Sequence, residues 1–169
     1  MGAGVVIDPS GIIITNGHTV DKANKITVAF KDNTVWPAEV LLVINNLDLG
    51  FLKVNVPSPL PIVTIADSDQ ITLGDEIITV GNSEFLKQTV SGGKIKGLGT
   101  SRSRQDQNQT DLIQTTVNLY KGDSGGPLFD HEGRLIGLMT ASETAHDHSS
   151  FAVPSNKIKK YLEEIKSGK

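Results

Sequence analysis

The stretch YKGDSGGPLFD, from Tyr120 to Asp130, surrounds a single serine, Ser124, with three glycines and a proline. Glycine inside β-structure costs stability, and it usually marks a bulge or a close approach between two backbones. At average residue frequencies, the string GDSGGP would arise by chance in roughly one of a hundred thousand chains of this length. A requirement other than packing therefore fixes this segment.

The glycines around Ser124 allow a turn in which the backbone N–H groups of Gly122 and Ser124 point at one spot beside the serine hydroxyl. Two convergent donors of this kind would hold the oxyanion of a tetrahedral acyl-transfer intermediate. A serine hydroxyl is a weak nucleophile, so it needs a base, and the base needs an orienting carboxylate. The segment predicts a nucleophile with an oxyanion hole; the alternative is a glycine-rich turn between strands.

Two polar residues stand at the ends of apolar runs, where a base and a carboxylate are expected. His18 follows GIIITN (11–16), and Asp48 precedes LGFLKV (49–54). Taken singly, His18 could be a satisfied structural group and Asp48 a turn or cap residue. The order His18, Asp48, Ser124 is nevertheless that of chymotrypsin-type proteases and differs from the order in subtilisins and α/β-hydrolases. We therefore expect these three residues to form a catalytic triad.

The composition limits the classes of protein to consider. Of 169 residues, 37% are apolar and 21% are charged, and the formal net charge is −3. This is typical of one globular unit, or of two small barrels that share a core, and it gives no electrostatic case for binding nucleic acid or an anionic membrane. No apolar run approaches the ~20 residues that cross a bilayer, and the opening residues do not resemble a signal peptide. There are no cysteines, so no thiol nucleophile is expected.

Short β-branched runs alternate with turn residues along the chain, a pattern typical of antiparallel sandwiches or barrels. The expected strands are 4–8, 11–16, 25–30, 34–44, 49–54, 75–81, 89–97, 111–116 and 134–140. The stretch TSRSRQDQNQTD (100–111) has no apolar residue and is expected to be a loop. One helix is expected over 155–167, where Ile158, Leu162 and Ile165 recur at helical spacing.

Nearly the whole chain resembles the protease domain of the HtrA (Deg) family of trypsin-like serine proteases. GAGVVIDPSGIIITNGHTV (2–20) is similar to the family's opening strand and histidine segment, and VWPAEVLLVINNLDLGFLKV (35–54) to its aspartate segment. TVSGGKIKGLG (89–99), the nucleophile region (111–141) and SSFAVPSNKIKKYL (149–162) continue the match to the closing strand and helix.

The resemblance implies an all-β fold of two antiparallel six-stranded barrels with the site between them. The expected parts are an N-terminal barrel (1–57), a C-terminal barrel (62–154) and a C-terminal helix (155–167). The family has a further strand upstream of the Gly-x-Gly opening, and none is present here. The first barrel is therefore expected with six strands or with one fewer, and no PDZ domain is expected after the helix.

The resemblance also implies roles for single residues. Ser124 would be the nucleophile, His18 the general base and acid, and Asp48 the carboxylate that orients the histidine. In trypsin-like folds the residue six positions before the nucleophile, here Asn118, lies at the base of the specificity pocket, and Leu119 would add apolar lining. Neutral Asn118 offers no counter-ion to Arg or Lys, so cleavage after small or medium apolar residues is expected.

The implied activity is that of a serine endopeptidase that cleaves unfolded or extended polypeptides through an acyl-enzyme, in protein quality control, without cofactor or metal. A substrate strand would pair with the main chain of Thr140, Ala141 and Ser142. The alternative is a noncatalytic peptide-binding module, or pseudoprotease, that uses the same groove. The family favours an extracytoplasmic compartment, such as the periplasm or cell envelope, and an open edge on the first barrel would favour a homo-oligomer.

Three features fall outside this pattern. Asp123 stands where the family usually has asparagine; in digestive trypsins this aspartate pairs with a newly cleaved N-terminal amine. No activation peptide is evident, so Asp123 is expected to have another partner or to face solvent. His146 and His148 form either half of a metal site or part of an exposed loop, and no third ligand is evident. Trp36 is expected in the core or at a barrel rim rather than in a partner-binding surface.

Overall fold

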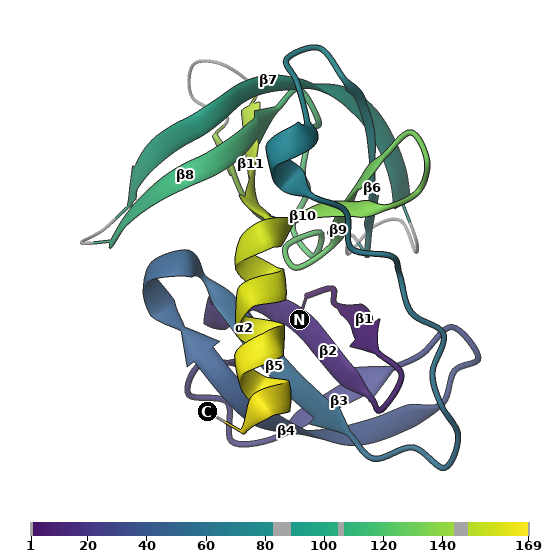
Figure 1. The fold of residues 1–169 in the computed structure, drawn as a ribbon. Coiled ribbons are helices and arrows are strands. Elements are labelled where there is room, and N and C mark those ends of the chain that lie inside the picture. The colour runs from purple at the N-terminus through teal and green to yellow at the C-terminus, as the bar shows by residue number, and fades with distance from the viewer. Residues whose placement is uncertain (1, 83–88, 105–106, 144–148, 169) are drawn as a thin grey trace.

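The computed structural model describes residues 2–82, 89–104, 107–143 and 149–168. The chain forms a β-sheet and a closed β-barrel, which lie one below the other in Figure 1, and a helix that crosses both. The first part contains β1 (Val5–Asp8), β2 (Ile12–Asn16), α1 (Gly17–Val20), β3 (Ile26–Ala29), β4 (Val35–Ile44), η1 (Asn45–Leu47) and β5 (Leu49–Val54). The second part contains η2 (Ser68–Gln70), β6 (Glu76–Gly81), β7 (Thr89–Arg104), β8 (Gln107–Thr115), β9 (Pro127–Asp130), β10 (Leu135–Glu143), β11 (Ser149–Pro154) and α2 (Ser155–Ser167).

The first part is an open antiparallel sheet of five strands in the order β1-β2-β5-β4-β3. The side chains of β2 and β5 are buried almost throughout, which suits their inner position in the sheet. The turn between β1 and β2 depends on Gly11, which has a φ of 99°. A Cβ at Gly11 would lie 2.3 Å from the Val54 carbonyl oxygen, so only glycine allows β1 and β2 to turn against β5 here.

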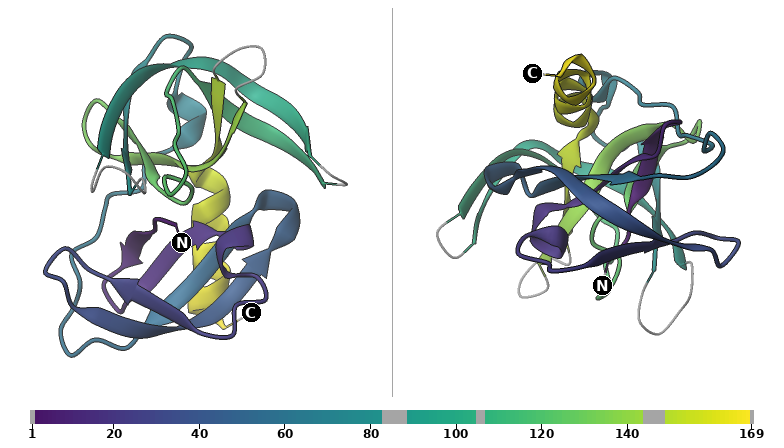
Figure 2. Two further views of the ribbon diagram at one scale, coloured as in Figure 1. Left: turned by 180° about the vertical axis from the view of Figure 1, so that it is seen from behind. Right: turned by 90° about the horizontal axis from the view of Figure 1, so that it is seen from below.

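The second part is a closed barrel of six strands in the order β10-β11-β8-β7-β6-β9, seen from behind in the left view of Figure 2. β7 and β8 extend beyond the barrel as a ribbon, in which Arg102 pairs with Gln109. The expected loop over 100–111 is therefore wrong for the described residues; 105 and 106 lie outside them. Because the ribbon projects from the barrel, it lacks the apolar alternation that marks a half-buried strand.

Three clusters of buried apolar side chains hold the fold together: one fills the barrel, one lies on the sheet, and one joins the two parts. Trp36 is half-buried and packs against the cluster on the sheet, as expected of a residue at a barrel rim. The cluster between the parts, called the shared cluster below, consists of Val5, Ile7, Ile12, Ile14, Leu49, Phe51, Leu112, Leu135, Leu138, Phe151, Val153, Ile158 and Leu162.

The predicted all-β class, with two antiparallel parts and a C-terminal helix, is confirmed. The first part has five strands, one fewer than six, and they form an open sheet instead of the expected barrel, because no pairing joins β1 to β3 among the described residues. α2 lies across both parts in Figure 1 and is attached to each by an ion pair. Lys157 in its first turn lies 3.1 Å from the Asp111 carboxylate on β8, and Lys166 in its last turn lies 2.6 Å from Asp8 at the end of β1. The helix therefore helps to fix the position of the barrel relative to the sheet.

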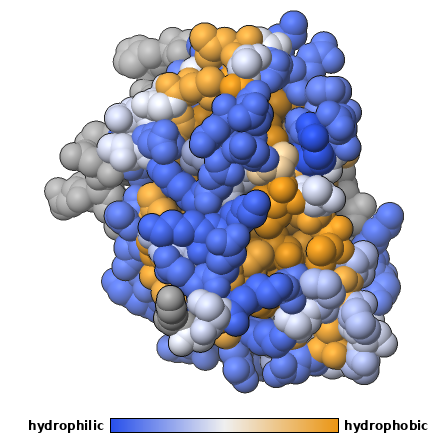
Figure 3. Space-filling model, viewed as in Figure 1, coloured by the Kyte–Doolittle hydropathy of each residue, from blue (hydrophilic) through white to orange (hydrophobic). Residues whose placement is uncertain are grey.

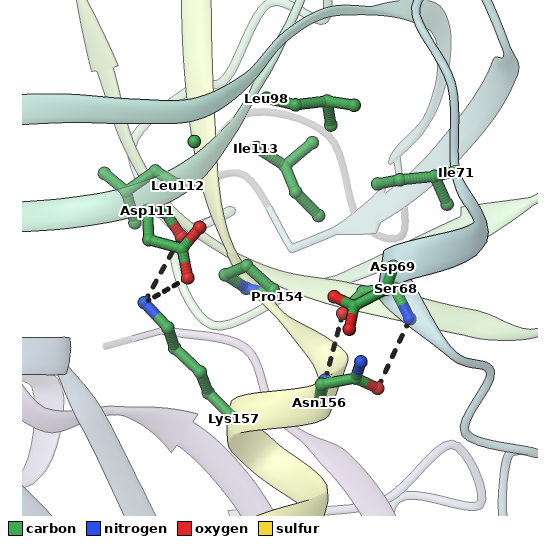
Figure 4. A pocket seen from close by; sticks show the side chains of 11 residues that line it. Ser68, Asp69, Ile71, Leu98, Asp111, Leu112, Ile113, Pro154, Asn156 and Lys157 are labelled. Carbon is green, nitrogen blue, oxygen red and sulfur yellow. Dashed lines mark hydrogen bonds and ion pairs between the residues drawn. The ribbon is translucent and has the colours of Figure 1, made fainter.

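Two hollows lie beside α2. The first, of about 240 Å³, has an apolar wall that includes Leu98 and Ile113, with the Asp111–Lys157 ion pair at its edge (Figure 4). The second, of about 510 Å³, is lined partly by Leu162, and Figure 3 shows apolar residues gathered to the right of this helix. Neither hollow is lined by the predicted triad residues. In the part of the chain that is described, no helix is long and apolar enough to span a membrane.

Candidate active site

His18 lies where the first part meets the second. β2 is buried along its whole length and ends at Asn16, and the short helix α1 then turns His18 outward. The His18 side chain is 49% exposed, so one side of its ring remains open to solvent. The ring is therefore accessible from solvent, and the role of His18 as a base rather than a structural group stays a prediction.

Asp48 lies between η1 and β5 in the left-handed conformation, with φ 55° and ψ 41°. Few residues other than glycine adopt it; aspartate does so more readily than most. The Asp48 carbonyl accepts two hydrogen bonds, from the Asn16 side-chain amide at 3.2 Å and from the Gly17 N–H at 3.0 Å. These contacts hold the backbone of Asp48 against the end of β2, directly beside His18.

The carboxylate of Asp48 and the ring of His18 form a closely fitted pair. The His18 Nδ1 atom lies 2.8 Å from Asp48 Oδ2 and 2.9 Å from Oδ1, and the His18 backbone N–H donates to Oδ1 at 2.9 Å. A carboxylate only accepts hydrogen bonds, so Nδ1 carries the proton and Nε2 is the nitrogen with a free lone pair. The pair can therefore accept a proton at Nε2 while the carboxylate stabilises the resulting imidazolium.

Thr140 makes a contact with Asp48 that no pattern in the sequence predicts. A β-bulge shifts the pairing of β10 with β11 between Met139 and Ala141. Thr140, which is 3% exposed, donates its hydroxyl to Asp48 Oδ2 at 2.5 Å. The two residues are 92 positions apart, and no motif links them, so only the docking of the barrel on the sheet brings them together. The side chain of Thr140 thus faces Asp48, while its backbone remains on β10.

Ser124 lies on the loop between β8 and β9, residues 116–126, called the nucleophile loop below. Gly122 and Gly125 have φ values of 103° and 85°, which side-chain-bearing residues rarely adopt, so the glycines around Ser124 are required by geometry. The Gly126 N–H donates to the Asp123 carbonyl at 2.9 Å, and the Asp123 N–H donates to the Tyr120 carbonyl at 3.0 Å. The loop is therefore closed on itself by backbone hydrogen bonds.

The backbone donors predicted for the oxyanion hole are free. Across the described ranges, neither the Gly122 N–H nor the Ser124 N–H has a hydrogen-bond partner. In the same ranges no hydrogen bond joins the Ser124 hydroxyl to His18. Contacts between a nucleophile and its base are often loose until substrate binds, so a catalytic pair does not require this hydrogen bond beforehand.

The nucleophile loop nonetheless lies against the segment that carries His18. A Cβ built on Gly2 would lie 3.0 Å from the Thr19 Cγ2 atom and 3.1 Å from the Ser124 carbonyl oxygen. Gly2 thus fits between Ser124 and the neighbour of His18. Of the three predicted triad residues, His18 and Asp48 are in direct contact, and the backbone of Ser124 approaches their segment through Gly2.

Asp123 is buried, at 3% exposure, and has a partner within its own loop. Its Oδ2 atom accepts the Tyr120 N–H at 2.9 Å, and among the residues described its Oδ1 atom has no partner. A Cβ at Gly81 on β6 would lie 1.9 Å from Oδ1, so this glycine makes room for the carboxylate. Of the two expected situations for Asp123, another partner rather than solvent is therefore observed.

The residues predicted to bind substrate lie in two places: Asn118 and Leu119 precede Ser124 on the same loop, and the other three belong to β10. Asn118 is exposed, and Leu119 is half-buried and packs against the cluster inside the barrel. Their part in a specificity pocket stays a prediction.

Ala141 and Ser142 pair with β11 on one edge of β10. On the other edge β10 pairs with β9 only as far as Leu138, and then Met139 exchanges hydrogen bonds with Gly125 and Gly126. No described strand pairs with Thr140, Ala141 or Ser142 on that second edge.

His146 and His148 lie outside the described residues. Within those residues, no group of three histidine, cysteine or acidic side chains could hold a metal ion. The two alternatives for His146 and His148, half of a metal site or part of an exposed loop, therefore both stay predictions.

Residues 2–138 match the family described as "Trypsin-like peptidase domain". The chain belongs to this family. The peptidase domain is 34% identical over 169 residues to the probable periplasmic serine protease do/HhoA-like of Haemophilus influenzae. It is 33% identical over 169 residues to the periplasmic pH-dependent serine endoprotease DegQ of Escherichia coli. Each match covers 98% of this chain, but 36% and 37% of those relatives.

Among solved structures, the peptidase domain resembles the HtrA-type protease AlgW with decapeptide, at 32% identity and a TM-score of 0.88. That match covers 98% of this chain and 51% of the other. The predicted resemblance to the HtrA family and the trypsin-like fold are thereby confirmed. The peptidase domain spans about a third of the length of the curated relatives that it matches.

Proposed function

We propose that this peptidase domain is a serine endopeptidase that cleaves unfolded or extended polypeptides through an acyl-enzyme. The observation that carries the proposal is the contact of His18 Nδ1 with both Asp48 oxygens, at 2.8 and 2.9 Å, which leaves Nε2 as the proton acceptor. Its relatives are named as serine proteases, and the chain order of the three residues is that of the chymotrypsin type.

In the proposed reaction, Ser124 Oγ attacks the scissile carbonyl carbon while His18 Nε2 takes the hydroxyl proton. The N–H groups of Gly122 and Ser124 bind the oxyanion that forms and so lower the barrier; the loss of one such donor raises it by about 2.7–4 kcal/mol. The C–N bond then breaks, and His18 gives its proton to the departing amine. Water, activated by the same histidine, hydrolyses the acyl-enzyme and releases the carboxylic acid.

The substrate is proposed to bind as an added β-strand along Thr140, Ala141 and Ser142. The edge of β10 without a described partner supports this, because backbone N–H and C=O groups there would pair with any extended chain. Such binding requires an unfolded or extended substrate segment and depends little on the amino-acid sequence of the substrate, because main-chain groups make the hydrogen bonds. It suits a role in protein quality control, for which an extracytoplasmic compartment is proposed because relatives are named as periplasmic.

A noncatalytic peptide-binding module is the second candidate. The observation in its favour is that, within the described ranges, the Ser124 hydroxyl makes no hydrogen bond with His18. A fluorophosphonate probe, which reacts only with an activated serine, separates the two candidates. Labelling of wild type that is lost in Ser124→Ala would establish the endopeptidase site. Peptide binding to the folded domain with no labelling under any condition would favour the binding module.

A further inference from the structure

The backbone of Ala3 joins the two parts of the fold beside Ser124. Its N–H donates to the Ser124 carbonyl at 2.9 Å, and its carbonyl accepts the Thr15 hydroxyl at 2.7 Å. Thr15 is only 3% exposed, so water does not compete for this hydroxyl. Two hydrogen bonds in series therefore connect β2 to the nucleophile loop, at the junction where the N-terminus lies in Figures 1 and 2.

The fit between these segments leaves no free space. A Cβ at Gly125 would lie 2.3 Å from the Ala3 carbonyl oxygen and 2.7 Å from Thr15 Oγ1. Gly125 also has a φ of 85°, so both its conformation and its surroundings exclude a side chain. The loop after Ser124 is thus pressed directly onto Ala3 and Thr15.

The peptide unit between Ser124 and Gly125 is held from both sides. The Ser124 carbonyl accepts from Ala3 in the first part, and the Gly125 N–H donates to the Met139 carbonyl at 2.9 Å in the second part. Because the peptide group is planar, fixing its oxygen and its nitrogen fixes its orientation. That orientation restrains the Ser124 Cα atom and the direction of its Cα–C bond, and so the backbone from which the hydroxyl side chain projects.

The strand that anchors this tether also carries the base. Thr15 precedes His18 by three residues, and it pairs with Gly50 of β5, two residues after Asp48. We propose that Thr15 is a positioning residue for the reaction: through Ala3, its hydroxyl fixes the Ser124 backbone to the strand pair that holds His18 and Asp48. This inference rests on the proposed function, since it concerns how the proposed nucleophile is placed.

The test compares Thr15→Val, which keeps the volume but removes the hydroxyl, with Thr15→Ser, which keeps the hydroxyl. A matched control is Thr79→Val, because Thr79 is also 3% exposed and its hydroxyl has no partner among the described residues. With a peptide substrate, kcat and the rate of fluorophosphonate labelling should fall about tenfold in Thr15→Val, as expected for one lost hydrogen bond that positions a reacting group. KM should stay unchanged, because the free edge of β10 is untouched. Thr15→Ser and Thr79→Val should remain within about twofold of wild type.

A second readout does not depend on activity. The Ala3 amide should be protected from hydrogen exchange in wild type and in Thr15→Ser, and should exchange faster in Thr15→Val, as followed by NMR. Thermal unfolding of each variant shows whether the fold survives the change. A Thr15→Val variant that is folded and keeps both the wild-type labelling rate and the Ala3 protection would overturn the inference. If wild type is not labelled at all, the proposed function fails, and the Ala3 exchange still decides whether Thr15 holds the loop.

Discussion

Replacing Thr140 with valine tests whether Asp48 is held from the barrel as well as from the sheet. The substitution keeps the shape of the side chain and removes the hydroxyl that donates to Asp48 Oδ2 at 2.5 Å. Hydrogen bonds to a charged group contribute about 1.5–3 kcal/mol. Thr140 is 3% exposed, so water cannot enter to replace the donor, and most of this free energy should be lost.

The loss should appear mainly in catalysis. The proposed role of Asp48 is to orient His18 and to stabilise it when it is protonated, and both matter most in the transition state. If the full contribution is lost there, kcat/KM falls about 10- to 100-fold, since about 1.4 kcal/mol corresponds to a factor of ten. Cleavage of an unfolded protein or of a peptide by the purified variant measures this directly.

Two further variants make the result decisive. Thr140→Ser keeps the donor and should stay close to wild type in kcat/KM, with a stability loss of about 1 kcal/mol for the missing methyl group. Thr115→Val removes a buried hydroxyl that bonds the Ser150 hydroxyl at 2.7 Å inside the barrel, so it should lower stability and leave kcat/KM unchanged. Wild-type kcat/KM in a folded Thr140→Val variant would refute the reasoning, and so would equal losses in the valine and serine variants.

Three other outcomes are expected. Ser124→Ala or His18→Ala should lower proteolysis by several orders of magnitude with little change in the unfolding temperature, and the double variant should be no worse than either single one, which activity assays and calorimetry would check. Cleavage sites mapped by mass spectrometry should follow small or medium apolar residues; a strong preference for Arg or Lys would contradict the assignment of Asn118. Hydrogen bonds from Lys166, and secondarily from Ser10, lower the pKa of Asp8 to about 2, so this carboxylate stabilises the fold at neutral pH and the contribution is lost as pH falls toward 2. Asp8→Asn should lower the free energy of unfolding by about 1 kcal/mol at neutral pH, a value reduced for screening because the Lys166 side chain is 57% exposed, and denaturant titrations should show the difference disappear near pH 2.

Much of the fold could be predicted because local pattern and burial agree. β2 and β5 are runs of β-branched and apolar residues, and they become the inner strands of the sheet. The ribbon formed by the outer halves of β7 and β8 could not be predicted in this way. Its strands pair with each other through polar residues, as Arg102 does with Gln109, so the hydrogen bonds that form the ribbon leave no apolar period in the sequence.

In the candidate site, too, the features with a local sequence pattern could be predicted, and the contacts between the two parts could not. The segments of His18, Asp48 and Ser124 have recognisable residue patterns, because each must adopt a particular local geometry. The contacts of Thr140 with Asp48 and of Ala3 with Ser124 have no such pattern. One depends on a bulge in β10 and the other on a single backbone N–H, and both form only where the two parts meet.

These two contacts cross the junction in opposite directions. Thr140, in the barrel, donates to Asp48 beside the sheet, while Ala3, beside the sheet, donates to Ser124 on the barrel. A shift of one part against the other would lengthen at least one of them, so the positions of base and nucleophile depend on how firmly the parts are docked. The shared cluster supplies that firmness close to the site: Leu49 follows Asp48 directly, Leu138 precedes Thr140 by two residues, and both leucines are fully buried in it. The geometry of the proposed catalytic groups therefore depends on the packing between the two parts, because the same strand ends carry the buried leucines and the residues of the site.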